Sequence, residues 1–127
     1  MISFESFIKE SDLPLYQQIE LFIKRGAIRG SIKDEDELPS RRMLSAILSV
    51  NPNTVQKAYK NLEDEGLIHT VLGSKSVMSL DEEKIGKLRE ELVKGEAVKT
   101  VRAMKEMGIS KNQGVKLLEK VWEEVDL

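Results

Sequence analysis

The residues most able to do chemistry in this sequence are four basic side chains in a segment without acidic residues. Between positions 38 and 62 the charged residues are Arg41, Arg42, Lys57 and Lys60. Acidic residues occupy positions 34–37 just before this window and 63–65 just after it. Positive charge focused in this way attracts an anionic polymer to one surface while its neighbours repel it. The window therefore favours nucleic-acid binding.

A predicted helix beginning at Asn51 carries two faces within this window. Asn51 is a good N-cap, and Pro52 suits the first helical position because its missing N–H costs nothing there. The apolar face repeats at i, i+3, i+4 and i+7 and consists of Val55, Ala58, Tyr59 and Leu62. The polar face repeats in the same way and consists of Asn53, Gln56, Lys57 and Lys60.

The polar face matches what DNA recognition requires. Asn and Gln side chains pair bidentately with adenine, and Lys contacts phosphates or guanine. In a helix-turn-helix the second helix enters the major groove with its N-terminus first. Asn53 and Thr54 are then expected to face base edges or phosphates.

The sequence lacks residue types that common catalytic sites require. There is no cysteine, and His69 is the single histidine, so nucleophilic triads and the usual zinc sites lack their residues. Asp64 and Glu65 near His69 are interpreted as solvated surface. We predict no enzyme, no metal site and no cofactor.

The composition sets the class of the protein. The chain has 127 residues, 20 basic and 22 acidic side chains and a net charge of -2, and 40% of it is hydrophobic. No run approaches the roughly 20 apolar residues of a membrane span, and the N-terminus lacks the basic start and apolar core of a signal peptide. We expect a soluble protein in the cytoplasm that does not contact membranes.

The spacing of apolar residues predicts the elements that carry the basic window. A helix is expected over 14–29, ending at Gly30, and a second begins after the N-cap Ser40. The predicted buried side of the second helix consists of Met43, Leu44, Ile47 and Leu48. Segments 67–72 and 76–79 bracket a turn at Gly73 and predict a hairpin. Three helices followed by a small ribbon predict a winged helix: a mainly α fold with a small β-wing.

The C-terminal part is predicted to be helical. Over 81–107 an apolar stripe changes phase near Gly95, which leaves open whether one helix or two form there. Ser110 and Gln113 have capping-box spacing and begin a last helix whose apolar stripe includes Trp122. This stripe is too apolar for a free tail, so we predict that it is intramolecular core or a dimer contact. Trp122 either anchors such a contact or closes the helix hairpin.

Three motifs in this order resemble the GntR family of bacterial winged-helix transcription regulators, and within it the short YtrA-like subfamily. They are P-L-Y-Q-Q-I at 14–19, L-P-S-R-R-M-L at 38–44 and N-P-N-T-V-Q-K-A-Y at 51–59, with Leu62-Glu63 and 66–68 completing the match. The resemblance covers residues 14–79. It implies a dimeric repressor that binds a palindromic operator and often controls a transporter operon.

The resemblance also implies roles by matching position. Ser40 and Arg42 hold the DNA backbone, the start of the recognition helix supplies the major-groove and flanking phosphate contacts, and the Gly73 turn is the wing tip. With the basic side chains added, the predicted DNA-contact set is Ser40, Arg41, Arg42, Asn51, Pro52, Asn53, Thr54, Gln56, Lys57, Lys60, Gly73 and Lys75.

Several positions depart from the family pattern. Glu35 replaces a turn glycine, and Lys75 replaces the second glycine of the wing. Pro52 and Gln56 stand where larger relatives often carry DNA-gripping arginines. We therefore expect modest affinity per half-site and a different operator specificity.

The predicted organisation is a winged helix-turn-helix DNA-binding domain over 1–79 and a helical dimerisation hairpin over 80–127. The predicted dimerisation residues are Leu88, Leu92, Val101, Met104, Val115, Leu118, Trp122 and Val125. A twofold dimer predicts half-sites about 10 bp or a multiple apart. Two alternatives remain: a protein-interaction adaptor without DNA binding, and a small-molecule-responsive regulator with a pocket near Met104, Met107 and Trp122.

Overall fold

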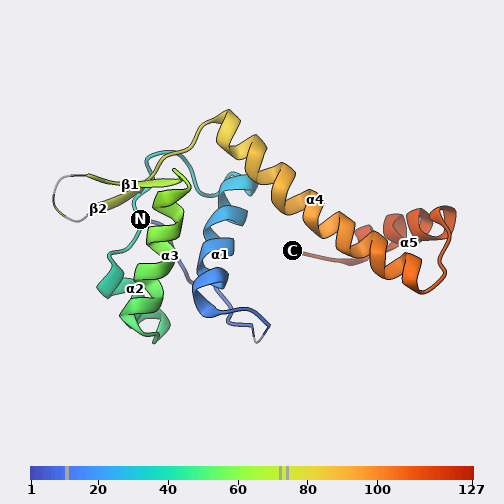
Figure 1. Ribbon diagram of the computed structural model, residues 1–127, viewed down its shortest axis with the longest axis horizontal. Helices are drawn as coiled ribbons and strands as arrows, with labels where there is room; N and C mark the ends of the chain where they lie inside the picture. The colour runs from blue at the N-terminus through green and yellow to red at the C-terminus, as the bar shows by residue number, and fades with distance from the viewer. Residues whose placement is uncertain (11, 72, 74) are drawn as a thin grey trace. The chain divides into compact units, whose positions relative to one another are not determined.

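The structure, a computed structural model, describes residues 1–10, 12–71, 73 and 75–127. Its elements are α1 (Leu15–Arg29), α2 (Arg41–Leu48), α3 (Pro52–Asp64), β1 (Ile68–Val71), β2 (Lys75–Met78), α4 (Glu82–Glu106) and α5 (Lys111–Glu124) (Figure 1). The predicted fold class, mainly α with a small β-wing, is confirmed. The chain divides into two compact units, Met1–Leu88 and Arg89–Leu127. Within the described residues, no helix combines the length and apolarity that crossing a membrane requires.

The core of the first unit forms where α1 and α2 pack against α3. The predicted apolar face of α3 is completely buried and consists of Val55, Ala58, Tyr59 and Leu62. From α1, Ile19 and Ile23 are equally buried. This packing leaves the polar side chains of α3 exposed: Asn53, Gln56, Lys57 and Lys60.

Side-chain caps set the start of α2 and of α3. The Ser40 hydroxyl accepts a hydrogen bond from the backbone N–H of Met43 at 3.1 Å. The Asn51 side chain accepts one from the N–H of Asn53 at 2.8 Å, and Pro52 occupies the first turn of α3. Both predicted caps are therefore confirmed. The short turn between α2 and α3 completes the helix-turn-helix.

Two residues of α2 that the sequence predicts as core lie on the surface. Met43 is 45% exposed and Ile47 57% exposed, whereas Leu44 and Leu48 are buried. Because each residue turns the helix by about 100°, the pair one position earlier faces away from α3. An eight-residue helix on the outside of the unit buries only one side. The prediction that Met43 and Ile47 belong to the buried side was therefore wrong.

The predicted hairpin is confirmed. In the antiparallel pair Ile68 lies opposite Met78 and Val71 opposite Lys75. Gly73 has φ 84°, a left-handed conformation that glycine adopts without steric cost. Leu72 and Ser74, which belong to the predicted strand and turn, lie outside the described residues.

Glu35 adopts a conformation that suits glycine. Its φ is 68°, and its backbone N–H donates to the carbonyl of Met78 at 2.9 Å. A side chain in this left-handed region is strained. The departure from the family's turn glycine thus leaves the backbone bend in place and adds strain.

Residues ahead of α1 pack onto the first unit. The rings of Phe4 and Phe22 stack with centroids 4.8 Å apart, and Phe7 meets Phe22 edge-on at 5.6 Å. The N–H of Ile2 donates to the carbonyl of Glu37 at 2.8 Å. The N-terminal segment is therefore part of the folded unit.

The sequence left open whether residues 81–107 form one helix or two. Residues 82–106 form one helix of 25 residues, α4, without a break at Gly95. The predicted capping box of α5 is present, with Ser110 and Gln113 bonded reciprocally. A Cβ built on Gly114 of α5 would lie 3.1 Å from the sulfur of Met104 on α4, so glycine permits the close approach of the two helices.

Candidate nucleic-acid interface

The polar face of α3 is open to solvent. Asn53, Gln56, Lys57 and Lys60 are exposed, and Thr54 is half-buried. Since the opposite face of the same helix is buried, α3 presents its polar groups in a fixed direction. Its N-terminal turn carries Asn53 and Thr54 at the end that would enter a groove first.

Lys57 is held by an aromatic ring of α1. Its ammonium lies 4.1 Å from the centroid of the Tyr16 ring, a distance at which the ring's negative face attracts a cation. The side-chain amide of Gln17 donates to the Tyr16 hydroxyl at 3.2 Å. The ring therefore limits the positions of a lysine that also faces solvent.

The two arginines at the start of α2 differ in environment. The Arg41 guanidinium lies 5.3 Å from the centroid of the Tyr59 ring, and its Nε is buried without an acceptor among the described residues. The Tyr59 hydroxyl donates to the carbonyl of Pro39 at 2.7 Å, and burial raises the pKa of that hydroxyl. Arg42, one position later, is exposed. Arg42 is thus free to extend toward a partner, whereas Arg41 is half-buried with its guanidinium over the Tyr59 ring.

Two lysines of the surface have nearby carboxylates. Lys60 lies 3.5 Å from Asp64 and Lys75 3.8 Å from Glu37. Exposed pairs of this kind contribute little and yield to competing anions. No carboxylate forms an ion pair with Arg42 or Lys57 within the described residues.

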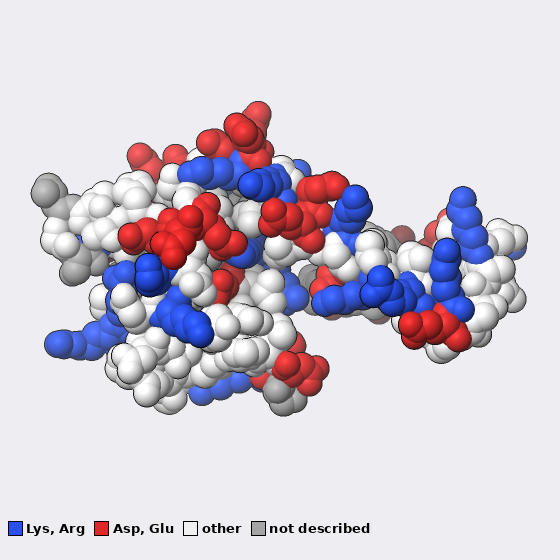
Figure 2. Space-filling view, viewed as in Figure 1, with Lys and Arg blue, Asp and Glu red and all other residues white. Residues whose placement is uncertain are grey.

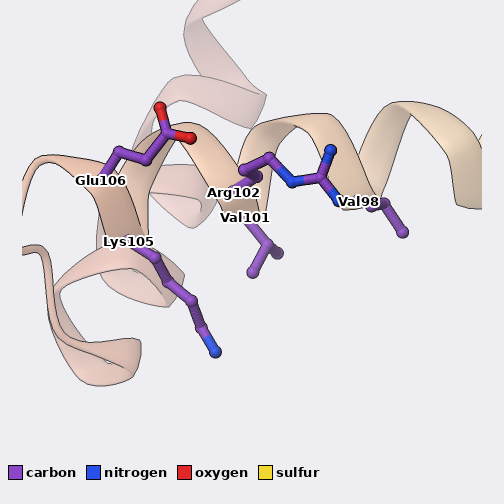
Figure 3. A pocket seen from close by; sticks show the side chains of 5 residues that line it. All are labelled: Val98, Val101, Arg102, Lys105 and Glu106. Carbon is purple, nitrogen blue, oxygen red and sulfur yellow. The ribbon is translucent and has the colours of Figure 1, made fainter.

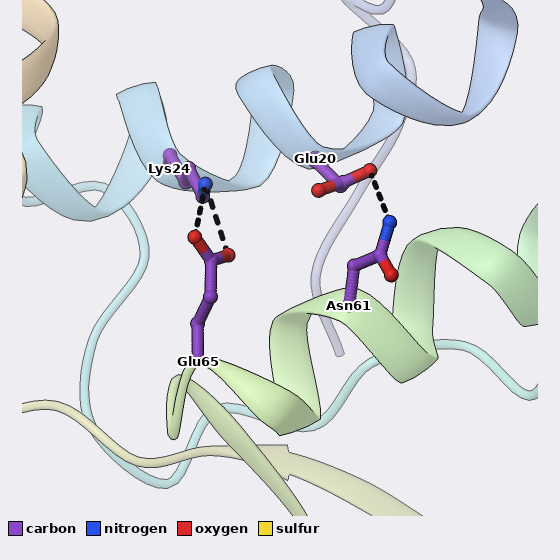
Figure 4. Close-up of polar contacts among 4 residues, drawn as sticks. All are labelled: Glu20, Lys24, Asn61 and Glu65. Carbon is purple, nitrogen blue, oxygen red and sulfur yellow. Dashed lines mark hydrogen bonds and ion pairs between the residues drawn. The ribbon is translucent and has the colours of Figure 1, made fainter.

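Two polar contacts join the C-terminal end of α3 to α1. Lys24 contacts the Glu65 carboxylate at 3.0 Å, and the Asn61 amide donates to Glu20 at 3.2 Å (Figure 4). Burial raises the pKa of the Glu20 carboxyl, which the bond from Asn61 and the charge of Lys24 oppose. Figure 2 shows Lys and Arg side chains over α2 and α3 with Asp and Glu side chains beside them. The basic surface therefore has an acidic border.

The structure distributes the predicted DNA-contact residues over three places in the first unit: the start of α2, α3 with its N-cap, and the hairpin. The side chains of Ser40 and Asn51 cap helices, so they act on the backbone geometry of the surface. Tyr16 belongs beside this surface, but the sequence does not reveal it. Its contact with Lys57 joins positions far apart in the chain, for which no spacing rule exists.

The second unit has a different surface. Apart from Gly114, its residues are exposed or half-buried. Its exposed large apolar side chains are Val93, Val98, Val101, Met107, Val115, Leu117, Leu118, Val121, Trp122, Val125 and Leu127. Trp122 is 80% exposed, so of its two predicted roles it does not close the hairpin.

An open hollow of about 490 Å³ runs along α4 in this unit. It is lined by Val98, Val101, Arg102, Lys105 and Glu106, all on α4 (Figure 3). The pocket suggested by the sequence near Met104, Met107 and Trp122 is not this hollow, because none of those three side chains lines it. Of the predicted dimerisation residues, Leu88 is 5% exposed and belongs to the first unit.

Three helices with a capped, outward-facing α3, followed by a two-stranded wing, define the winged helix-turn-helix class of DNA-binding proteins. A family model described as bacterial regulatory proteins, gntR family, matches residues 15–76. The chain belongs to the GntR family, whose members are transcription regulators and not enzymes.

Individual relatives agree with this assignment. The chain is 46% identical over 69 residues to the HTH-type transcriptional repressor YtrA of Bacillus subtilis, a match covering 54% of this chain and 53% of YtrA, about half its length. It is similar to a GntR family transcriptional regulator from Listeria monocytogenes, with a TM-score of 0.81, 30% identity and coverage of 88% of this chain and 98% of that one.

A third similarity includes DNA. The DNA-binding domain of AraR, crystallised in complex with operator ORR3, has a TM-score of 0.50 and 26% identity to this chain, covering 57% of this chain and 87% of that one. A domain of similar fold thus binds operator DNA. The chain is accordingly a YtrA-like winged-helix regulator of DNA-binding type.

Proposed function

We propose that this protein is a sequence-specific repressor that binds an inverted-repeat operator as a homodimer. The observation that carries the proposal is the exposed polar face of α3, whose N-terminal turn is capped and oriented by the buried face behind it. The resemblance to YtrA adds repression, and an operon encoding a transporter is the regulated target that this resemblance implies.

Each part of the interface has its own contact in this proposal. Asn53 and Gln56 contact base edges in the major groove, with adenine as their best partner. Arg42 and Lys57 meet phosphates, because both lack a carboxylate partner among the described residues. Lys75 on the wing reaches a phosphate beside the Gly73 turn.

The homodimer is supported by the apolar surface of the second unit. Exposed apolar side chains on this scale favour association, and the aromatic Trp122 is a typical interface anchor. A second copy of the same surface gives a twofold dimer, and two α3 helices then address half-sites about 10 bp or a multiple apart. We propose that the exposed members of the predicted set, Val101, Val115, Leu118, Trp122 and Val125, form this contact.

Selection from a random pool of double-stranded DNA at about 150 mM salt tests the proposal, because such salt suppresses weak electrostatic binding. We expect enrichment of an inverted repeat. No enrichment by protein shown to be folded and dimeric would contradict the proposal and favour the adaptor hypothesis or a regulator that requires an effector. Enrichment of a single, non-repeated site would retain DNA binding and overturn the symmetric dimer.

A further inference from the structure

The connection between the wing and α4 is bonded to the first unit along its length. The N–H of Ser79 donates to the carbonyl of Leu67 at 2.8 Å, and that of Leu80 donates to the Asp34 carboxylate at 2.8 Å. The Asp81 side chain then accepts from the N–H of Lys84 at 2.8 Å and caps α4. The connection is therefore an ordered part of the unit and not a free linker.

Lys84 joins three elements within this connection. Its ammonium donates to the carbonyl of Gly66 at 2.6 Å, to the carbonyl of Ser79 at 3.2 Å and to the Ser79 hydroxyl at 3.0 Å. Gly66 follows Glu65, the C-cap of α3, and Ser79 directly follows β2. All three donors of this half-buried lysine are thus used to hold the first turn of α4 against the exits of the recognition helix and the wing.

Neighbouring apolar contacts act in the same direction. Leu80 is 7% exposed and Leu88, one turn beyond Lys84, is 5% exposed. Among the described residues no carboxylate pairs with Lys84, so the lysine serves as a three-way donor. The first turns of α4 are anchored to the unit that contains α3, and α4 continues as one helix to Glu106.

We propose that Lys84 is a positioning residue that couples the recognition helix to the dimerisation helix and so makes affinity depend on half-site spacing. The proposal rests on the proposed function, a dimer on an inverted repeat. α3 has 13 residues and is about 20 Å long, so Lys84 lies at the end away from Asn53 and does not touch DNA. It acts by holding the first turn of α4 against the residues that follow α3 and β2, within the first unit.

The test uses the full chain, the selected inverted repeat and versions with one or two base pairs added or removed between the half-sites. Each base pair shifts a half-site by about 3.4 Å and 35°. The operator affinity of wild type should fall by about tenfold or more when the spacing changes, a loss comparable to that caused by one mismatched base pair. The Lys84→Met variant should lose only about threefold, while its affinity for an isolated half-site stays within about twofold of wild type.

Lys87→Met is the matched control, because Lys87 is exposed on the same helix, and it should behave as wild type. If Lys84→Met unfolds, Ser79→Ala removes one of the three acceptors and should relax the spacing dependence by an intermediate amount. Spacing dependence equal to that of wild type in a folded, dimeric variant overturns the role of Lys84. Absence of spacing dependence in wild type also overturns it, whereas absence of inverted-repeat binding in wild type overturns the proposed function itself.

Discussion

The two units of this chain use the same sequence pattern to different ends. In Met1–Leu88, apolar residues at helical spacing meet inside the unit, and Ile19, Ile23 and Leu62 are completely buried. In Arg89–Leu127 the same spacing leaves the apolar side chains outside, with Trp122 80% exposed. Periodicity thus indicates that a face will be buried, but it does not tell whether the cover comes from the same chain.

The two units also differ in the contacts that their charged side chains make. The first unit holds its charged groups in defined contacts, such as Lys57 on Tyr16 and Lys24 on Glu65. The second unit has ion pairs only between neighbours on α4 among the described residues, such as Lys94 with Glu90. We infer that recognition is built into the first unit before binding, whereas the second unit completes its packing on association.

The largest expected effect breaks the second unit's association. Trp122→Glu places a charge in the proposed dimer contact and should convert the dimer to a monomer, with operator affinity lower by about 30-fold or more. Sedimentation equilibrium and DNA titration measure the two effects. Lys120→Glu adds a carboxylate to the same helix at an exposed position and should remain dimeric. A dimeric Trp122→Glu would contradict the assignment of this surface.

A substitution in the recognition surface should weaken DNA binding and leave the dimer intact. Arg42→Ala removes an exposed cation from the start of α2 and should weaken operator binding about tenfold, with the slope of log affinity against log salt smaller by about one. Arg25→Ala on α1 is the control, because Arg25 follows Lys24 near the far end of α3. Unchanged affinity for a folded Arg42→Ala would show that α2 does not contact the DNA backbone.

A third substitution affects the stability of the first unit alone. Glu35→Gly relieves the strain at φ 68° and should raise the free energy of unfolding by about 1 kcal/mol. Urea unfolding of the dimer at fixed protein concentration measures this change. The dissociation constant of the dimer should stay the same. Glu37→Gly is the control, because no positive φ is found at that position, and it should destabilise the chain.

The fourth prediction concerns how Lys57 is held. Tyr16→Leu removes the aromatic ring and should weaken operator binding about threefold, whereas Tyr16→Phe keeps the ring and should bind as wild type. Combining Tyr16→Leu with Lys57→Gln should add little to the loss caused by Lys57→Gln alone. Additive losses would show that the ring and the lysine act independently.

The smallest expected effect is a pH dependence from Glu20. Because burial raises its pKa, the folded chain keeps a proton that the unfolded chain has already released. The stability that Glu20 contributes is present at low pH and is lost as the pH rises through the raised pKa. Relative to Glu20→Gln, wild type should therefore lose stability in thermal melts as the pH rises above 4.5, the ordinary pKa of a glutamate side chain. A difference that is constant with pH would contradict this; the exposed Glu83→Gln provides the control.

Local rules predicted much of the first unit. The caps Ser40 and Asn51 and the buried face of α3 depend on residues within a few positions of each other, and all are present. Met43 and Ile47 were predicted as core because their spacing suits it, but the tertiary arrangement covers only one side of α2. The packing of Phe4 on Phe22 joins residues far apart in the chain and leaves no local pattern.

For the candidate site the same division holds. The exposed face of Asn53, Gln56 and Lys57 follows from helical spacing once the opposite face is buried. Tyr16 and Lys84 escape sequence analysis, because their partners are brought near by folding. Gly86 and Gly95 made the continuity of α4 undecidable in advance, since glycine only weakens a helix.

In the proposed dimer, the second unit joins two copies of a preformed recognition surface. Sedimentation of wild-type protein with the selected inverted repeat, and with a single half-site of it, tests this most directly. We expect two chains to bind the inverted repeat at a concentration about tenfold or more below that needed for the half-site. A single chain on the inverted repeat, or equal affinity for the two DNAs, would contradict it.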